Sequence, residues 1–344
     1  MDLNNILFSS DDDSDGENSG QRPIYKPRIN FEIANDFQFK EKFRLRRTEV
    51  QLVLDRIGQD LPIPQRYYSL TPREQLLLTL HWLGTGTYYH AIGDMHGPSK
   101  SSVCCIVKHV VNAIVDNLFQ DVVRWPDNTD DIAPEFLRKG GFPCVSGCVD
   151  GTLIKIDAPT INEEQYVDRN GNHSLNVMVI CGPDFSFYAV NSRWPGSVHD
   201  SRVLRTSAVS SQLENGWRSF AGAVILADSG YGLKEWLIPP HPHNDTIAEV
   251  RFNRAHKSTR RLVENAIGIF KERFPILNFM RLNPAYAGRI VMACSALHNI
   301  ASKDDFDPPV GNNDTPHDGG DHAQSGNMCA SGRARVQELL NYFI

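Results

Sequence analysis

The hydrophobic periodicity of the chain changes at Gly140-Gly141, and this change restricts the fold more than any other feature of the sequence. Before the two glycines, apolar residues recur at helical spacing, whereas after them they form the runs typical of strands. Gly182-Pro183-Asp184 is a turn sequence between two of these runs. The pattern predicts strands at 145–156, 175–181, 185–191 and 223–227 and helices at 200–213, 255–274 and 289–301. We therefore expect an α/β unit that begins with three antiparallel strands.

The order strand, strand, strand, helix, strand, helix is that of a ribonuclease H-like α/β fold, and we assign this domain to residues 140–302. Residues 21–139 are predicted to form a preceding all-helical domain, because 344 residues suffice for about two domains with tails. Residues 1–20 carry six acids and no base, and we expect them to be disordered. Residues 303–344 form a second acidic, flexible tail with a short helix at 335–343.

The net charge of −6 is distributed unevenly, since the two tails are acidic and residues 21–302 carry +4. A mildly basic body permits contact with nucleic acid, although a strong autonomous binder carries a larger basic patch. No apolar run approaches 18 residues, and the first residues lack the pattern of a secretory signal. The seven scattered cysteines are not a disulfide framework and lack the spacing of a zinc finger. We expect neither a membrane protein nor a secreted one.

The helical half contains a pattern typical of a helix-turn-helix at about 71–119. Thr71-Pro72-Arg73-Glu74 combines an N-cap, a proline at the first helical position and a capping-box glutamate. A short helix at 88–95 and a turn at Gly97-Pro98 follow, and a third helix then begins. This arrangement would place Ser99, Lys100 and Ser101 at the start of a recognition helix. Because Cys104-Cys105 stand where base-reading side chains are common, phosphate contact is the safer prediction, and a plain helical domain packed on the α/β unit is the alternative.

Acidic residues interrupt or follow the apolar strands. Asp150 lies within a run that otherwise looks buried, and Asp228 follows the strand at 223–227. A buried charge is costly unless it is paired or holds a metal, and neighbouring strands would bring both carboxylates to one end of the sheet. Glu264, on the predicted helix at 255–274, would supply a third carboxylate, and such a trio can hold two Mg²⁺ ions for in-line displacement at phosphorus. Taken singly, each has an ordinary structural interpretation: a strand-end turn or cap, or a salt bridge on a solvated helix face.

Several local motifs resemble the DDE core of PIF/Harbinger transposases. These motifs occur in the family's order and are Cys148-Val149-Asp150-Gly151-Thr152, Pro195-Gly196-Ser197-Val198-His199-Asp200-Ser201, Leu226-Ala227-Asp228-Ser229-Gly230-Tyr231, and the run from Phe252-Asn253-Arg254-Ala255-His256 to Arg261-Leu262-Val263-Glu264. The resemblance covers roughly residues 40–300. It implies a ribonuclease H-like nuclease core that uses a divalent cation, Mg²⁺ or Mn²⁺.

Carried over by position, the resemblance implies that Asp150, Asp228 and Glu264 are catalytic and bind the metal. It also implies that Asp200, in the family's His-Asp motif, is a fourth metal ligand, although taken alone this residue is most simply a helix N-cap. His199 either orients the substrate or packs. Basic residues around Glu264 would neutralise the DNA backbone; they are Lys257, Arg260, Arg261 and Lys271.

The leading hypothesis is therefore a metal-dependent DNA endonuclease or strand transferase. The resemblance implies a Myb-like DNA-binding partner and a nuclear location, with residence in the cytoplasm when the partner is absent; homo-oligomerisation stays open. The alternatives are a non-catalytic nuclear scaffold that retains the transposase fold, and a metal-dependent RNase or phosphohydrolase. The basic run at 40–47 is either a DNA contact, a weak nuclear signal or a solvated helix face.

Overall fold

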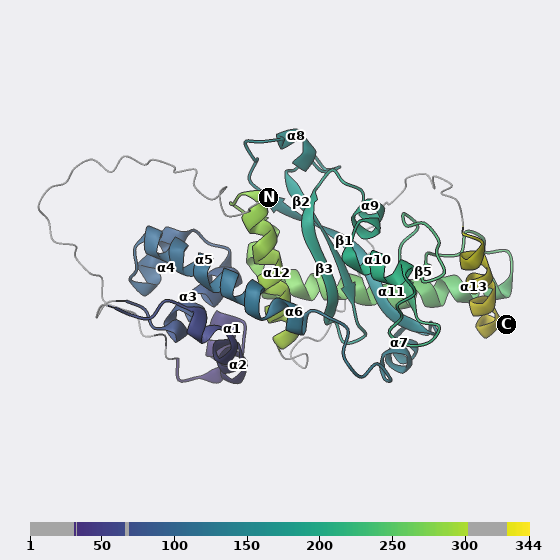
Figure 1. Ribbon diagram of the computed structural model, residues 1–344, viewed down its shortest axis with the longest axis horizontal. Helices are drawn as coiled ribbons and strands as arrows, with labels where there is room; N and C mark the ends of the chain where they lie inside the picture. Colours follow the sequence, from purple (N-terminus) through teal and green to yellow (C-terminus); the bar gives the residue numbers. More distant parts are fainter. Residues whose placement is uncertain (1–30, 32, 66–68, 302–328) are drawn as a thin grey trace, which may run out of the picture.

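The computed structural model describes residues 31, 33–65, 69–301 and 329–344, and it has a mixed α/β fold (Figure 1). The predicted disorder of 1–20 and most of the predicted tail at 303–344 lie outside the described residues. The strands are β1 (Val145–Ile156), β2 (Ser174–Cys181), β3 (Phe187–Pro195), β4 (Val224–Leu226), β5 (Leu237–Ile238) and β6 (Phe279–Met280). None of the described helices is long and apolar enough to cross a membrane.

The strands form one sheet in the order β3-β2-β1-β4-β5. The first three strands are antiparallel neighbours, as predicted, whereas β4 is parallel to β1 and β5 is parallel to β4. The third strand begins two residues later than predicted because Phe185 adopts a left-handed conformation, with φ of 67°, within the turn that Gly182 and Ser186 close. The short β6 pairs with the end of β1, where Lys155 lies opposite Phe279.

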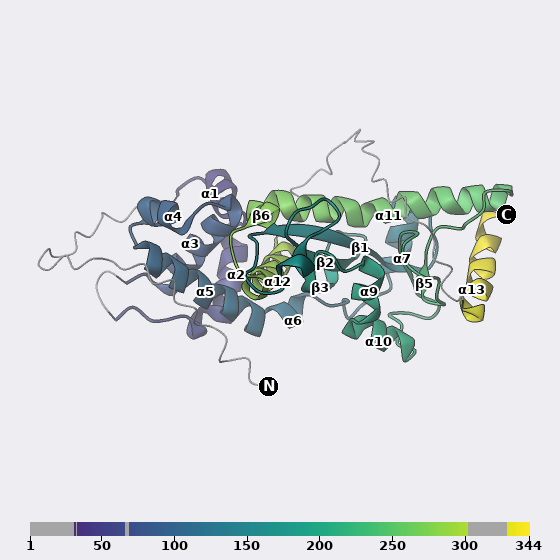
Figure 2. The ribbon, with the colours of Figure 1, turned by 90° about the horizontal axis from the view of Figure 1, so that it is seen from above.

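Helices cover both faces of the sheet (Figure 2). On one face lies α11 (Ile247–Arg273), which begins eight residues before the predicted helix because Thr246 and Glu249 form a capping box. On the other face lie α9 (Asp200–Arg205) and α10 (Ala208–Glu214). These two replace the single helix predicted at 200–213, since Ser207 accepts a hydrogen bond from the Ser210 amide and starts a new helix. The remaining elements of this part are α8 (Glu163–Tyr166), η3 (Pro275–Asn278), α12 (Pro284–Ile300), α13 (Ala330–Leu340) and η4 (Asn341–Phe343).

The helical part precedes the sheet, as predicted. Its elements are α1 (Asp36–Phe43), α2 (Arg47–Ile57), η2 (Gly58–Asp60), α3 (Pro72–Thr85), α4 (Tyr89–His96), α5 (Lys100–Asn117), α6 (Phe119–Val122) and α7 (Ile132–Gly140). The capping box of Thr71 and Glu74 is present, and Gly86 ends α3 in a left-handed conformation. Ser99 caps α5 by accepting from the Ser102 amide. Lys100 and Ser101 thus lie in the first turn of α5, exposed to solvent.

One hydrophobic core connects the helical part to the sheet. Val110 of α5, Val291 of α12 and Val179 of β2 belong to a single cluster of buried residues. Helix α12 makes this connection, because it packs against both α5 and β3 (Figure 1). The division predicted at 139/140 therefore runs between elements that share a core.

Candidate active site

The candidate site lies along a section of β1 that pairs with β2 on one side and is unpaired on the other. On one side, β1 pairs with β4 up to Cys148 and with β6 from Lys155, and the described residues place no strand between these two pairings. Asp150 lies in this section, two residues beyond the last β4 pair. Because β4 is parallel to β1, Asp228, two residues after the end of β4, emerges at the same end of the pairing. The topology thus brings together the two aspartates that the sequence singled out.

Helix α11 brings a third carboxylate to this section through an arginine. Arg260 places one guanidinium nitrogen, Nη1, 3.2 Å from Asp150 Oδ2. Its other nitrogen, Nη2, lies 2.5 Å from Oε1 of Glu264, one helical turn further along α11. The Asp150 and Arg260 side chains are 16% and 19% exposed, whereas Glu264 is 45% exposed. Arg260 therefore bridges a nearly buried carboxylate and one that faces solvent.

Burial raises the pKa of Asp150 to about 6, although the positive charge of Arg260 opposes this effect. The negative charges of Asp228 and Glu264 raise this pKa further, and the hydrogen bond that the Gly151 amide donates to the Asp150 carboxylate lowers it. One arginine thus fails to compensate for the burial and crowding of the carboxylates. The site is short of positive charge.

Asp228 is held by the turn that follows it. The Gly230 amide donates to Asp228 Oδ1 at 2.9 Å. A methyl group at Gly230 would lie 3.2 Å from that same oxygen and 3.3 Å from Cε1 of His199, so the imidazole and the carboxylate converge on this glycine. The His199 ring is exposed at the N-terminus of α9, where Nδ1 accepts from the Ser201 amide. It therefore caps a helix beside the candidate site and is not packed in the core.

Asp200 approaches β1 from the face opposite α11. Its carboxyl carbon lies 2.4 Å from the position that a Cβ atom at Gly151 would take, so only glycine leaves room for it. Asn176 Nδ2 donates to Asp200 Oδ1 at 2.5 Å. Since successive residues of a strand point to opposite faces, Asp150 faces α11 and Asp200 lies across the strand from it. The unpaired edge of β1 is where the two sides meet.

Several buried polar atoms around these carboxylates lack a hydrogen-bond partner: Tyr231 Oη, Asn176 Oδ1 and Arg260 Nη1. As the side chains stand, no three His, Cys, Asp or Glu residues in the described part of the chain are grouped closely enough to hold a metal ion. The donor set nevertheless fits a hard divalent cation, because carboxylate oxygens and retained waters are what Mg²⁺ prefers and such waters would partner the orphaned atoms. Sequence reasoning missed Asn176 and Tyr231 as neighbours of the site; Tyr231 follows Asp228 in its motif.

The basic residues predicted to contact DNA are not equivalent in the structure. Lys257 and Arg261 are exposed on α11. Lys271 instead donates to the Leu153 carbonyl at 3.1 Å, and burial lowers the pKa of its ammonium group. Arg260 is engaged by the carboxylates, so the sequence found this residue but not its ion pairs.

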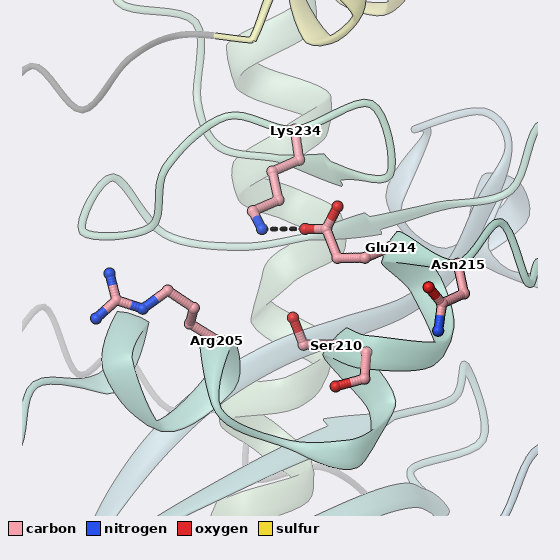
Figure 3. Close-up of a pocket in the computed structure, with 6 residues that line it drawn as sticks. Arg205, Ser210, Glu214, Asn215 and Lys234 are labelled. Carbon is pink, nitrogen blue, oxygen red and sulfur yellow. Dashed lines mark hydrogen bonds and ion pairs between the residues drawn. The ribbon is translucent and has the colours of Figure 1, made fainter.

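A polar cavity of about 400 Å³ lies between α10 and the segment that carries Lys234 (Figure 3). Lys234 and Glu214 form an ion pair across it. Its lining residues are Arg205, Ser210, Ser211, Glu214, Asn215 and Lys234. None of the candidate carboxylates lines this cavity, and the sequence analysis did not predict it.

The DDE superfamily endonuclease family matches residues 149–299, which include Asp150, Asp228 and Glu264. The chain is also 30% identical to the HARBI1 protein of Mus musculus, over 92% of this chain and 93% of that protein. The chain belongs to the PIF/Harbinger family of DDE transposases and transposase-derived nucleases. Human HARBI1 is 30% identical over the same shares, and both HARBI1 proteins carry the word nuclease in their names.

A plant relative, Protein ALP1-like of Arabidopsis thaliana, is 25% identical over 76% of the chain and 70% of that protein. No solved structure matches the chain. The family assignment agrees with the resemblance found in the sequence motifs, and it supports a nuclease or transposase type of function.

Proposed function

We propose that the chain is a metal-dependent DNA endonuclease of the transposase type, which hydrolyses phosphodiester bonds or transfers strands. The observation that carries this proposal is the position of Asp150, nearly buried at the section of β1 that is unpaired on one side and electrostatically coupled to both Asp228 and Glu264. A strand order of 3-2-1-4-5 with only the second strand antiparallel to the rest supports a ribonuclease H-like assignment for residues 140–302.

Asp150, Asp228 and Glu264 would hold the divalent cation, Mg²⁺ or Mn²⁺, and Asp200 would join them from the other side of β1. When bound, such cations activate water, or a 3′-hydroxyl in strand transfer, and stabilise the leaving oxygen. The protein's own part is to fix the ligands. The Gly230 amide orients Asp228, Asn176 orients Asp200, and the Gly151 amide orients Asp150. Fixed donors of this kind limit the reorganisation that catalysis requires.

DNA is the proposed substrate. Lys257 and Arg261 are exposed on the helix that carries Glu264, so they can neutralise phosphates next to the site. We propose the helical part, within 21–139, as a helix-turn-helix-like domain. Ser99 and the first turn of α5 would contact the phosphates of the DNA backbone through amides of the helix N-terminus and through Lys100.

The remaining proposals concern the cellular setting. The mild charge of +4 over residues 21–302 supports a division of labour in which a Myb-like partner supplies DNA specificity and nuclear entry. The protein would then act in the nucleus and stay in the cytoplasm without the partner. Assembly with a second copy of the chain is compatible with this scheme.

A second candidate function is a non-catalytic nuclear scaffold that keeps the transposase fold. One observation favours it: Arg260 ties Asp150 to Glu264, and the carboxylates do not converge on a common point. The two candidates differ in whether divalent cations bind and whether DNA is cut.

The test is nicking of supercoiled plasmid by the purified full chain in Mg²⁺, Mn²⁺ or EDTA, with and without a Myb-like partner. The Asp228→Ala variant removes a proposed metal ligand, and Asp130→Ala removes an exposed aspartate far from the site along the chain as a matched control. Metal-dependent nicking that Asp228→Ala abolishes and Asp130→Ala retains would establish the nuclease. Folded protein that never cuts, with or without the partner, would favour the scaffold.

A further inference from the structure

We propose that the guanidinium group of Arg260 and the divalent cation compete for the same oxygens of Asp150 and Glu264. Arg260 would then set the metal affinity of the site as a resident counter-charge. This inference rests on the proposed function, because it takes the carboxylates to be metal ligands.

The geometry brings the guanidinium and the cation into conflict at two oxygens, Asp150 Oδ2 and Glu264 Oε1. Asp150 has two oxygens: Oδ1 accepts from the Gly151 amide at 3.0 Å, and Oδ2 faces Arg260 Nη1 at 3.2 Å. Glu264 Oε1 is taken by Arg260 Nη2 at 2.5 Å. A Mg²⁺ ion binds carboxylate oxygens at roughly 2.0–2.1 Å. At Oδ2 it would stand beside the guanidinium, and two cations so close repel each other strongly next to a nearly buried carboxylate.

The arginine fits its position poorly for a purely structural ion pair. Its Nη1 is buried and lies within ion-pair distance of Asp150, yet it makes no hydrogen bond of good geometry. Arg260 is also 19% exposed, and its Nη2 reaches Glu264 at the solvent-facing end of the site. A counter-charge that lies close to Asp150 without a well-aligned hydrogen bond to it is what competition requires.

Competition and a purely structural role of Arg260 predict opposite changes in metal affinity when the arginine is removed. If Arg260 only holds the carboxylates together, its removal loosens the ligands and weakens metal binding. If it competes, its removal frees two ligand oxygens and strengthens metal binding. The sign of the change in metal affinity therefore decides between the two.

The experiment is isothermal titration of Mn²⁺ into the full chain, comparing wild type with Arg260→Gln, Arg260→Lys and Arg254→Gln. Arg254→Gln is the matched control: it removes the same charge from the same helix, but Arg254 is exposed, and six residues separate it from Arg260. Titrations at pH 7.0 and 8.5 separate metal competition from proton competition at the carboxylates. Thermal melts in EDTA report whether each variant is folded.

We expect Arg260→Gln to bind Mn²⁺ about tenfold more tightly at pH 8.5, a change of about 1.4 kcal/mol. Arg260→Lys should fall between wild type and Arg260→Gln, because an ammonium group cannot bridge two carboxylates as a guanidinium does. Arg254→Gln should match wild type. If folded Arg260→Gln binds Mn²⁺ as wild type does or more weakly, the competition is wrong and the proposed function stands. If the glutamine variant does not fold, Arg260→Lys decides in the same way. Absence of Mn²⁺ binding in every folded variant would instead remove the metal site and the proposed function with it.

Discussion

Two of the regions that bury ionisable side chains differ in the charge that these side chains carry at pH 7. In the helical part, His81 of α3 and His96 of α4 are 8% and 0% exposed, and Nδ1 of the first lies 2.7 Å from Nε2 of the second. The Phe31 ring stacks on His96 at 4.5 Å, and Phe43 meets His81 edge-on. Burial lowers the pKa of His81 to about 4 and that of His96 to about 3, so both rings are neutral at pH 7.

The carboxylate site differs, because its nearly buried group is charged at pH 7. Asp150 stays ionised at pH 7 beside other carboxylates, on a strand section that pairs with β2 on one side and with no strand on the other, and its single arginine leaves the charge uncompensated. The histidines are neutral and share a hydrogen bond between their rings, and Nδ1 of His96 is left without a partner. The carboxylates need a cation from outside. The comparison teaches that burial alone does not mark a functional group, whereas burial combined with unbalanced charge at an open edge does.

The largest expected effect separates activity from stability at Asp150. Asp150→Asn should reduce metal-dependent nicking at least about 1,000-fold, because a proposed metal ligand is lost. The same change should stabilise the protein in EDTA at pH 7.5 by about 1–3 kcal/mol, since a pKa raised from 3.8 to about 6 means that the ionised carboxylate opposes folding. Urea unfolding and the plasmid assay measure the two quantities. A variant that is both inactive and less stable would remove the contrast with the histidine pair.

The next effect tests the histidine pair as a structural element. His96→Ala should destabilise the protein by about 3 kcal/mol, because it opens a cavity beside Phe31 and leaves His81 without its partner. His90→Ala, an exposed change on the same helix, should stay within about 0.5 kcal/mol of wild type. Urea unfolding at pH 7 compares them. Metal-dependent nicking at a temperature where His96→Ala is folded should match wild type, and a specific loss of nicking would contradict a purely structural role.

The two regions should also respond to pH with opposite signs. The histidines have folded pKa values below the unfolded value of 6.5, so their stabilising effect is lost as the pH falls below 6.5. Asp150 has a folded pKa of about 6, above its unfolded 3.8, so its contribution to stability grows as the pH falls from 6 to 4. In EDTA, Asp150→Asn should therefore lose stability about 1 kcal/mol per pH unit faster than wild type between pH 6 and 4.5. Urea unfolding across this range checks it, and parallel profiles would show that Asp150 titrates as an ordinary surface carboxyl.

The sequence predicted those parts of both regions that depend on neighbours along the chain. The capping box at Thr71 that starts α3 follows from local residue types, and it is present. The strand that carries Asp150 was predicted with its observed bounds, because apolar and β-branched residues recur from Val145 to Ile156 on both sides of the aspartate. The sequence analysis placed both aspartates at one end of the sheet on the condition that their strands are neighbours, and the pairing of Cys148 with Leu226 meets that condition.

What the sequence did not predict depends on contacts between distant segments. Two-residue strands such as β6 exist only through pairing, here of Phe279 with Lys155, and have no periodicity of their own. Arg260 was predicted from its basic neighbours as a DNA contact, but its ion pair with Asp150 follows from how α11 lies across β1, 110 residues away. The histidine pair went unnoticed for the same reason, since two scattered histidines show no pattern until α3 and α4 pack.

The smallest expected effect concerns Asp200, on the far side of β1, and whether it binds the metal together with Asp150, Asp228 and Glu264. Gly151→Ala places a methyl group where the Asp200 carboxylate now lies, 2.4 Å from its carboxyl carbon, so Asp200 must shift. If Asp200 is a ligand, the Kd for Mn²⁺ should rise about tenfold, because one charged oxygen donor is displaced, equivalent to about 1.4 kcal/mol. Gly232→Ala is the control, as a methyl group there meets no atom within 4 Å.

Isothermal titration of Mn²⁺ measures both glycine variants, and thermal melts in EDTA show whether β1 has kept its packing. A tenfold loss of Mn²⁺ affinity in Gly151→Ala, with an unchanged melting temperature, would show that Asp200, which Asn176 holds, belongs to the metal site. Unchanged Mn²⁺ affinity with a shifted Asp200 would show that the metal ligands lie only on the α11 side of β1. Asp200 would then resemble the histidine pair more than its fellow carboxylates, because a hydrogen bond within the protein, from Asn176, would hold it without a cation.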